Sequence, residues 1–254
     1  MRSLCVLLLL VGFTSLDSEQ LKGFDPDWIQ LTVRLERAAL EGVASDLRTI
    51  RSDLQRRVGG AGADEAVVRY TLAYVAFRMV NLPDVSDKER KDLLEDAVTQ
   101  LQQIIKRHPT DAEAHALLGS VYGLQIAESP IVRGMTLGPR ASGALDRAAG
   151  IESGNPRVLL LQGVSAFNTP AIFGGGTDKA EGFLRRSLER FAVEPADKAW
   201  PNWGRFDAHV WLGQTLVQKG DRTGARAEYD KARALAPNSG WLRYVLIPAL
   251  EAKR

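Results

Sequence analysis

The sequence predicts an all-α protein in which antiparallel helix pairs stack into a right-handed solenoid that ends in a capping helix. Two observations predict this fold. Apolar residues recur at helical spacing along most of the chain. A pattern of small-x-x-x-large-x-x-small residues begins at Ala141, Ala180 and Ala225, and a looser copy begins at Ala97. Small residues let two helices approach closely, and the large residue fills the space between them.

Composition indicates a folded globular chain without a strong excess of either charge. The 254 residues are 45% apolar and 25% charged, which is ordinary for a folded protein. The 33 basic and 31 acidic residues leave a net charge of +2 and are interspersed along the chain. Because no basic stripe accumulates, we expect no nucleic-acid partner.

Residues 1–18 have the pattern of a secretory signal peptide. Arg2 precedes the apolar run Leu4–Phe13, and small and polar residues follow. The run is shorter than the roughly 20 apolar residues that span a bilayer. Cys5, the only cysteine, lies inside this segment, so the mature chain is expected to have no disulfide and no thiol chemistry. We expect an exported protein, periplasmic in a Gram-negative bacterium and otherwise secreted, with no stable membrane insertion after cleavage.

The remaining chain divides into three predicted parts. Residues 19–62 form an N-terminal helical segment, with one helix from Asp25 to about Val58 that ends at a run of glycines. Residues 63–239 form an array of about four helix pairs. Residues 240–254 form the capping helix, which Pro248 is expected to bend or shorten.

The spacing within the predicted pairs identifies the repeat type. Twelve residues separate Gly213 from Ala225, which is the ordinary interval of a tetratricopeptide repeat (TPR), whereas 22 separate Gly119 from Ala141. Armadillo and HEAT repeats have periods of about 40 to 47, close to the alanine spacings here. The regular fourth unit favours TPR units that carry insertions.

Two insertions are predicted as loops along one edge of the array, at Leu124–Pro139 and Asn168–Gly176. Both contain apolar residues, which must be buried against something. The edge is therefore either a binding surface or a region where the loops only pack against the array. The candidate binding residues that these loops contribute are Arg133, Met135, Asn168 and Phe173.

Two further sets of residues are candidates for ligand contact. Trp200, Trp203 and Arg205 have the composition of a recognition hot spot, but they could equally fill the joint between two repeats. Leu160 and Val164, together with Phe173, could line a channel for an apolar small molecule.

The sequence predicts no catalytic residue, no metal site and no cofactor. It contains neither an H-E-x-x-H nor a G-x-S-x-G motif. His108, Asp111 and His115 are expected to cap or pack helices, since the helix break at Pro109 separates them. Gly174–Gly176 precede a helix without the spacing of a phosphate-binding loop, so a tight turn is expected there, with Thr177 as the N-cap. We therefore expect a protein that is not an enzyme.

Five short segments recur in a known type of protein: Asn155-Pro156, Phe173-Gly-Gly-Gly-Thr-Asp-Lys-Ala180, Trp203-Gly204, Trp211-Leu-Gly213 and Pro237-Asn-Ser-Gly-Trp241. Through these segments the sequence from about Asp111 to Pro248 resembles secreted bacterial TPR proteins. The Phe-Gly-Gly loop before a small-residue helix is also similar to the T component of TRAP-type uptake systems, which implies a solute-binding protein as partner and a hydrophobic solute channel.

The expected function is a non-catalytic exported TPR scaffold that binds a protein partner through the insertion-loop edge and the concave groove. The alternative is a periplasmic small-molecule carrier or transporter accessory that holds an apolar organic solute. The groove-facing positions lack the Lys/Asn/Arg carboxylate clamp of chaperone-binding TPR domains, so capture of a peptide C-terminus is not expected.

Overall fold

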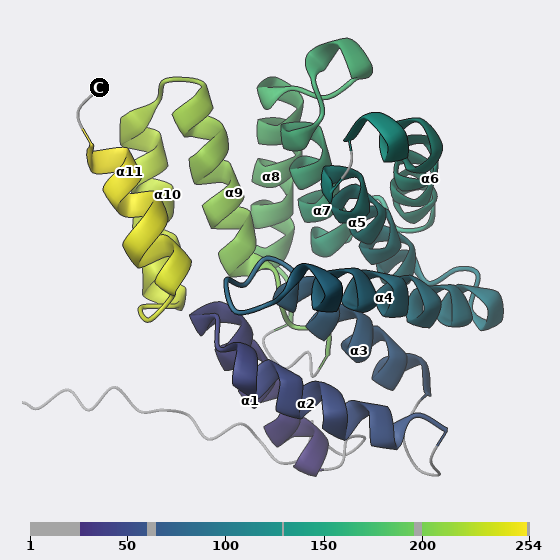
Figure 1. Ribbon diagram of the computed structural model, residues 1–254. Coiled ribbons are helices and arrows are strands. Elements are labelled where there is room, and N and C mark those ends of the chain that lie inside the picture. Colours follow the sequence, from purple (N-terminus) through teal and green to yellow (C-terminus); the bar gives the residue numbers. More distant parts are fainter. Residues whose placement is uncertain (1–25, 60–64, 129, 196–199, 253–254) are drawn as a thin grey trace, which may run out of the picture.

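The computed structural model describes residues 26–59, 65–128, 130–195 and 200–252. The predicted signal peptide, residues 1–18, lies outside them. Every regular element in the described ranges is helical, as predicted (Figure 1). The long helices are α1 (Pro26–Glu41), α2 (Ala44–Arg57), α3 (Glu65–Met79), α4 (Asp87–Arg107), α5 (Ala112–Glu128), α6 (Pro130–Ile151), α7 (Pro156–Asn168), α8 (Thr177–Ala192), α9 (Arg205–Gln218) and α10 (Arg222–Leu235).

Consecutive helices pack as antiparallel pairs, and the odd-numbered helices also contact one another in succession, which makes them the inner layer of the array (Figure 1). The chain ends in a capping helix that begins with a π-helical turn, η2 (Leu242–Leu246), and continues as α11 (Ile247–Glu251). The wider π turn accommodates Pro248, which has no N–H to donate. Across the described ranges, no helix has the length and apolarity that a bilayer-spanning segment requires.

The predicted single helix from Asp25 to Val58 is wrong. Gly42 adopts a positive φ of 78°, and both Gly42 N and Val43 N donate to Ala38 O, which ends α1. The chain then reverses into α2 (Figure 1). Periodicity could not reveal the break, because buried apolar residues continue at helical spacing on both sides of it. The pair α1–α2 therefore precedes the pairs α3–α4 to α9–α10.

The predicted loop Leu124–Pro139 is also wrong. Helix α5 extends to Glu128 and α6 begins at Pro130, so the insertion lengthens both helices, and Pro139 lies inside α6. The second insertion is a loop, as predicted, with one 3₁₀ turn, η1 (Ala171–Phe173). The N-cap of α8 is Gly176 and not Thr177, which is the first helical residue.

The predicted small–large–small pattern does produce close helix pairing. A Cβ atom placed on Gly213 would lie 2.3 Å from Tyr229 Cε1, and one on Gly163 would lie 2.7 Å from Leu184 Cγ. These large residues occupy the fifth position of the patterns that begin at Ala225 and Ala180. The glycine of one helix thus receives the large side chain of the next, as the repeat requires.

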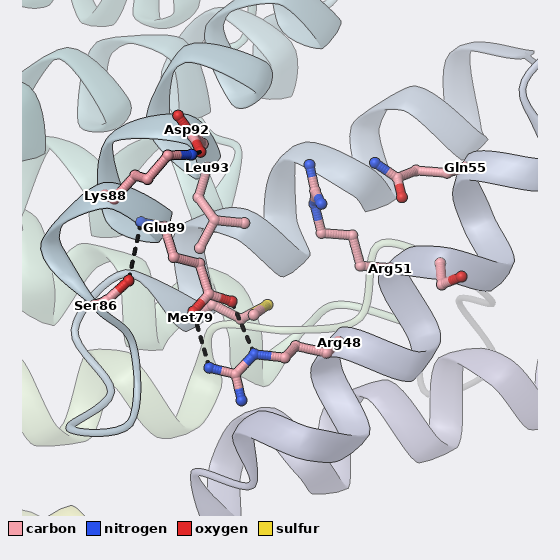
Figure 2. Close-up of a pocket in the computed structure, with 10 residues that line it drawn as sticks. Arg48, Arg51, Gln55, Met79, Ser86, Lys88, Glu89, Asp92 and Leu93 are labelled. Atoms are coloured by element: carbon pink, nitrogen blue, oxygen red, sulfur yellow. Dashed lines mark hydrogen bonds and ion pairs between the residues drawn. The ribbon is translucent and has the colours of Figure 1, made fainter.

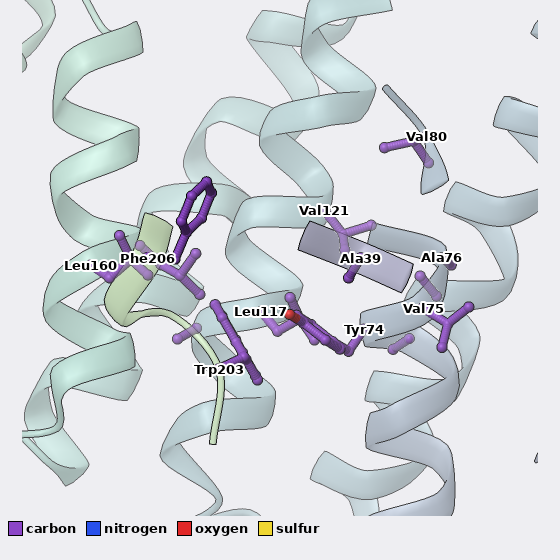
Figure 3. Close-up of a cluster of buried hydrophobic side chains, with 14 of the residues drawn as sticks. Ala39, Tyr74, Val75, Ala76, Val80, Leu117, Val121, Leu160, Trp203 and Phe206 are labelled. Atoms are coloured by element: carbon purple, nitrogen blue, oxygen red, sulfur yellow. The ribbon is translucent and has the colours of Figure 1, made fainter. Parts of the chain in front are cut away.

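The array also closes on itself through the loop that precedes α9. Trp203 is 2% exposed and stacks on Tyr74 of α3 with ring centroids 4.8 Å apart, and its Nε1 donates to Tyr70 Oη at 3.2 Å. Beside it, Arg78 of α3 forms an ion pair of 2.7 Å with Asp207 of α9. Figure 3 shows Trp203 directed toward Tyr74. We call this set of five residues the closing junction.

Glu36 of α1 faces the closing junction with one carboxylate oxygen unsatisfied. Its Oε1 atom is buried and has no hydrogen-bond partner. Burial raises the pKa of the Glu36 carboxyl to about 7, although the neighbouring Arg78 favours the ionised form and Tyr74 hydrogen-bonds to it. Asp207 adds to the increase by repelling a second negative charge.

We predict that Gly213→Leu destabilises the protein by on the order of 1–3 kcal/mol or more, because the added side chain collides with Tyr229. The matched control is Gly182→Leu in α8, where a Cβ atom meets nothing within 4 Å. Urea unfolding of both variants measures the difference. Equal stability of the two variants would show that the helix register is wrong.

We predict that Glu36→Gln becomes more stable relative to the wild type as the pH rises. Between the ordinary pKa of 4.5 and about 7, the unfolded wild-type chain releases a proton that the folded state retains. The wild type therefore loses stability over this window, and the neutral Gln side chain does not. Unfolding free energies at pH 5, 6, 7 and 8 test this prediction, and a difference that stays constant with pH contradicts it.

Candidate functional site

The polar residues at the start of the inner helices contact one another. Arg157 of α7 is fully buried and forms two hydrogen bonds with Glu194, at 2.7 and 2.9 Å. It also lies 3.6 Å from Glu113 of α5, whose carboxylate accepts from Asn155 Nδ2 at 3.0 Å. Since Asp207 is held by Arg78 in the same way, this end of the concave side is occupied by internal ion pairs.

Trp200 and Trp203, in the described part of the segment before α9, pack against α3, in agreement with the predicted alternative that they fill the joint between helices. Trp203 is buried, and Trp200 is half-buried with its ring 5.7 Å from that of Tyr74. Arg205 is exposed at the first position of α9. Trp203 therefore supplies packing and offers no free surface to a partner.

The predicted channel residues lie in different environments. Leu160 is 1% exposed and packs under the loop, where a Cβ atom on Gly204 would approach its Cδ2 to 3.1 Å. Val164 is half-buried on the same helix, whereas Phe173 is 75% exposed on η1. The three side chains do not form one enclosed lining.

The predicted edge residues lie on two elements: Arg133 and Met135 are in α6, whereas Asn168 ends α7 and Phe173 is in η1. The loop between α7 and α8 is at the top of Figure 1. Met135, Ile172 and Phe173 are the most exposed large apolar side chains of the described chain, at 84%, 85% and 75%. Two polar candidates have structural partners: Arg133 pairs with Glu128 at 2.7 Å, and Asn168 Nδ2 donates to Val164 O at 2.8 Å. We call Met135, Ile172 and Phe173 the apolar edge.

A row of aromatic side chains crosses the last three inner elements and was missed in the sequence. Phe167 of α7 meets Trp211 of α9 edge to face at 5.3 Å, and Trp211 meets Trp241 in the same way at 6.0 Å. Tyr244 follows Trp241 on the capping helix. The only sequence signal was one or two aromatic residues on each element, which fit the repeat pattern equally well.

A cavity of about 420 Å³ opens between α2 and α4 (Figure 2). Each cation in its lining already holds a carboxylate. Arg48 forms two hydrogen bonds with Glu89, and Lys88 pairs with Asp92 at 2.8 Å. Arg51 pairs with Asp96 at 2.5 Å. The charge of this cavity is neutralised internally, so it makes a weak anion site.

The histidines and glycines considered in the sequence have structural roles. Asp111 Oδ1 accepts from Ala114 N at 2.8 Å, which caps α5 as predicted, and a ring nitrogen of His115 lies 3.1 Å from Pro109 O. Gly174 and Gly176 have positive φ angles in the turn before α8, as the tight-turn prediction requires. Within the described ranges, no group of His, Cys, Asp and Glu residues is arranged to hold a metal ion.

Comparison with known proteins identifies structural likeness. No family model and no curated protein matches this chain. Among solved structures, the HusA haemophore from Porphyromonas gingivalis is 26% identical, over 74% of this chain and 92% of that chain, with a TM-score of 0.62. TTC0263, a TPR protein from Thermus thermophilus, is 19% identical, over 89% of this chain and 98% of that chain, with a TM-score of 0.60.

These two structures bear directly on the predicted fold. They are a haemophore and a TPR protein, and the TM-scores of 0.62 and 0.60 show that both have a fold like that of this chain. The resemblance to the T component of TRAP-type systems stays a prediction. The chain is a TPR-like helical protein, and its structural neighbours are consistent with a helical scaffold or binding protein.

Proposed function

We propose that this protein is an exported, non-catalytic scaffold that binds a protein partner through the apolar edge. The observation that carries this proposal is the exposure of Met135, Ile172 and Phe173. Burial of apolar surface by a partner would stabilise the complex by about 25 cal/mol for each Å² removed from water. Met135 lies in α6, and Ile172 and Phe173 lie in η1, so the three side chains come from the two insertions that were predicted to share one edge of the array. An exposed apolar patch is typical of an interaction site.

The packing of the concave side supports the choice of the edge. The closing junction and the pair Arg157–Glu194 occupy the side of the array where many repeat scaffolds hold ligands. The two insertions, which lengthen α5 and α6 and form the α7–α8 loop, are then the surface that departs most from the repeat. Export follows from the predicted signal peptide, so the mature protein would begin after residue 18 and act in the periplasm or outside the cell.

The edge is tested by the triple variant Met135→Ser, Ile172→Ser, Phe173→Ser. We predict that partners co-purifying with the wild type from the native extracellular or periplasmic fraction are lost from this variant. The matched control is Val33→Ser, Val193→Ser, which changes side chains that are 61% and 70% exposed elsewhere. Quantitative mass spectrometry of the purified complexes compares the three proteins, and the same set of partners on all three contradicts the proposal.

A second candidate function is the binding of an apolar organic small molecule. The likeness to a haemophore favours it, because the match covers nearly all of that chain. The enclosed channel expected from Leu160, Val164 and Phe173 gives it no support, because these residues are buried, half-buried and exposed, respectively. A small ligand therefore needs another surface.

A further inference from the structure

We propose that Phe167, Trp211, Trp241 and Tyr244 form a binding surface for a planar aromatic molecule of porphyrin size that carries carboxylate groups. Arg243 would receive one of the carboxylates. This inference rests on the second candidate function, small-molecule binding, and assigns it a site.

Phe167, Trp211 and Trp241 contact one another in succession, and the exposure of the aromatic side chains increases from them to Tyr244. The two centroid steps of 5.3 and 6.0 Å join three rings, and their length is comparable with the width of a tetrapyrrole ring. Phe167 and Trp211 are half-buried, Trp241 is 41% exposed and Tyr244 is 71% exposed. The inner rings are thus anchored in the core, while the outer rings have free faces.

Anchored rings are suited to hold a flat ligand. Phe167 and Trp211 pack against buried core residues, so their orientation is set before any ligand arrives. Tryptophan and tyrosine have few rotatable bonds, and they supply a large contact area at a low cost in conformational entropy. Successive rings of the row are inclined by 67° and 63°, so a planar ligand stacks on the free face of an outer ring, Trp241 or Tyr244, while the inner rings hold Trp241 in place. A flexible aliphatic chain would gain less from such a surface.

Charge at the exposed end of the row favours an anionic ligand. The guanidinium carbon of Arg243 lies 5.4 Å from the centroid of the Tyr244 ring. In the described ranges no carboxylate pairs with Arg243, whereas the nearby Arg226 pairs with Glu251 and Arg233 with Asp230. A cavity of about 270 Å³, lined by Arg233, Arg243, Leu242 and Ile247 among others, lies beside it. A carboxylate placed there would meet a free cation over an apolar floor.

The local backbone places the cation and the outer tyrosine on the same irregular turn. Arg243 and Tyr244 lie in η2, the π-helical turn. Turns of this kind inside helices are rare and occur frequently at functional sites. Trp241 immediately precedes the turn, so the exposed end of the row and its cation lie on this one irregular turn.

The full chain is titrated with haemin, metal-free protoporphyrin IX, protoporphyrin dimethyl ester and a saturated fatty acid, with tryptophan fluorescence and porphyrin absorbance as readouts. We expect both free-acid porphyrins to bind with similar affinity, because stacking and not iron ligation holds them. Trp241→Ala and Tyr244→Ala should each weaken binding at least about fivefold. Arg243→Gln should weaken the free acids but not the dimethyl ester.

The control is Phe173→Ala, which removes a 75% exposed aromatic ring from the apolar edge and should leave porphyrin affinity unchanged. Melting temperatures of the variants establish that each is folded. Porphyrin binding that survives Trp241→Ala, Tyr244→Ala and Arg243→Gln would overturn this surface while leaving small-molecule binding in place. Binding of haemin alone would overturn the stacking proposal, and no binding of any compound would remove the second candidate function as well.

Discussion

The packing of Trp203 between the fourth helix pair of the repeat array and α3, with the Arg78–Asp207 ion pair beside it, sets the shape of the whole molecule. In an ordinary solenoid each repeat contacts only its neighbours, so the concave side stays open along its length. Here α3 and α9, which stand three pairs apart, are held together. That contact occupies the start of the groove. The surfaces that stay available for binding are the apolar edge and the aromatic row near the C-terminus.

The contact between α3 and α9 buries polar groups, and whether each group has a partner decides its effect on the stability of the fold. A buried charge is costly unless it is paired, and Arg157 and Arg78 each hold a carboxylate at 2.7 Å. Arg157 Nε and Glu36 Oε1 are buried without a hydrogen-bond partner, and burial raises the pKa of the Glu36 carboxyl to about 7. A group that faces the closing junction therefore opposes folding when it ionises near neutral pH.

Local features of the fold could be predicted from the sequence, whereas contacts between distant residues could not. Gly213 and Tyr229 carry the repeat pattern within one helix pair, and their packing followed from spacing alone. Arg78 and Asp207 are 129 residues apart, and nothing in their sequence neighbourhoods indicates the pairing. The break at Gly42 was hidden by continuous apolar periodicity. The aromatic row could not be predicted from the sequence, because only the superhelical arrangement brings Phe167, Trp211 and Trp241 together from three separate elements.

A double-mutant cycle between Arg78 and Asp207 tests the closed arrangement most directly. Arg78→Met, Asp207→Asn and the double variant are compared with the wild type by urea unfolding. If α3 and α9 are in contact in solution, the two changes are strongly non-additive, with a coupling energy on the order of 1.5 kcal/mol or more. Effects that add to within about 0.5 kcal/mol would mean that the two helices do not meet and that the groove is open.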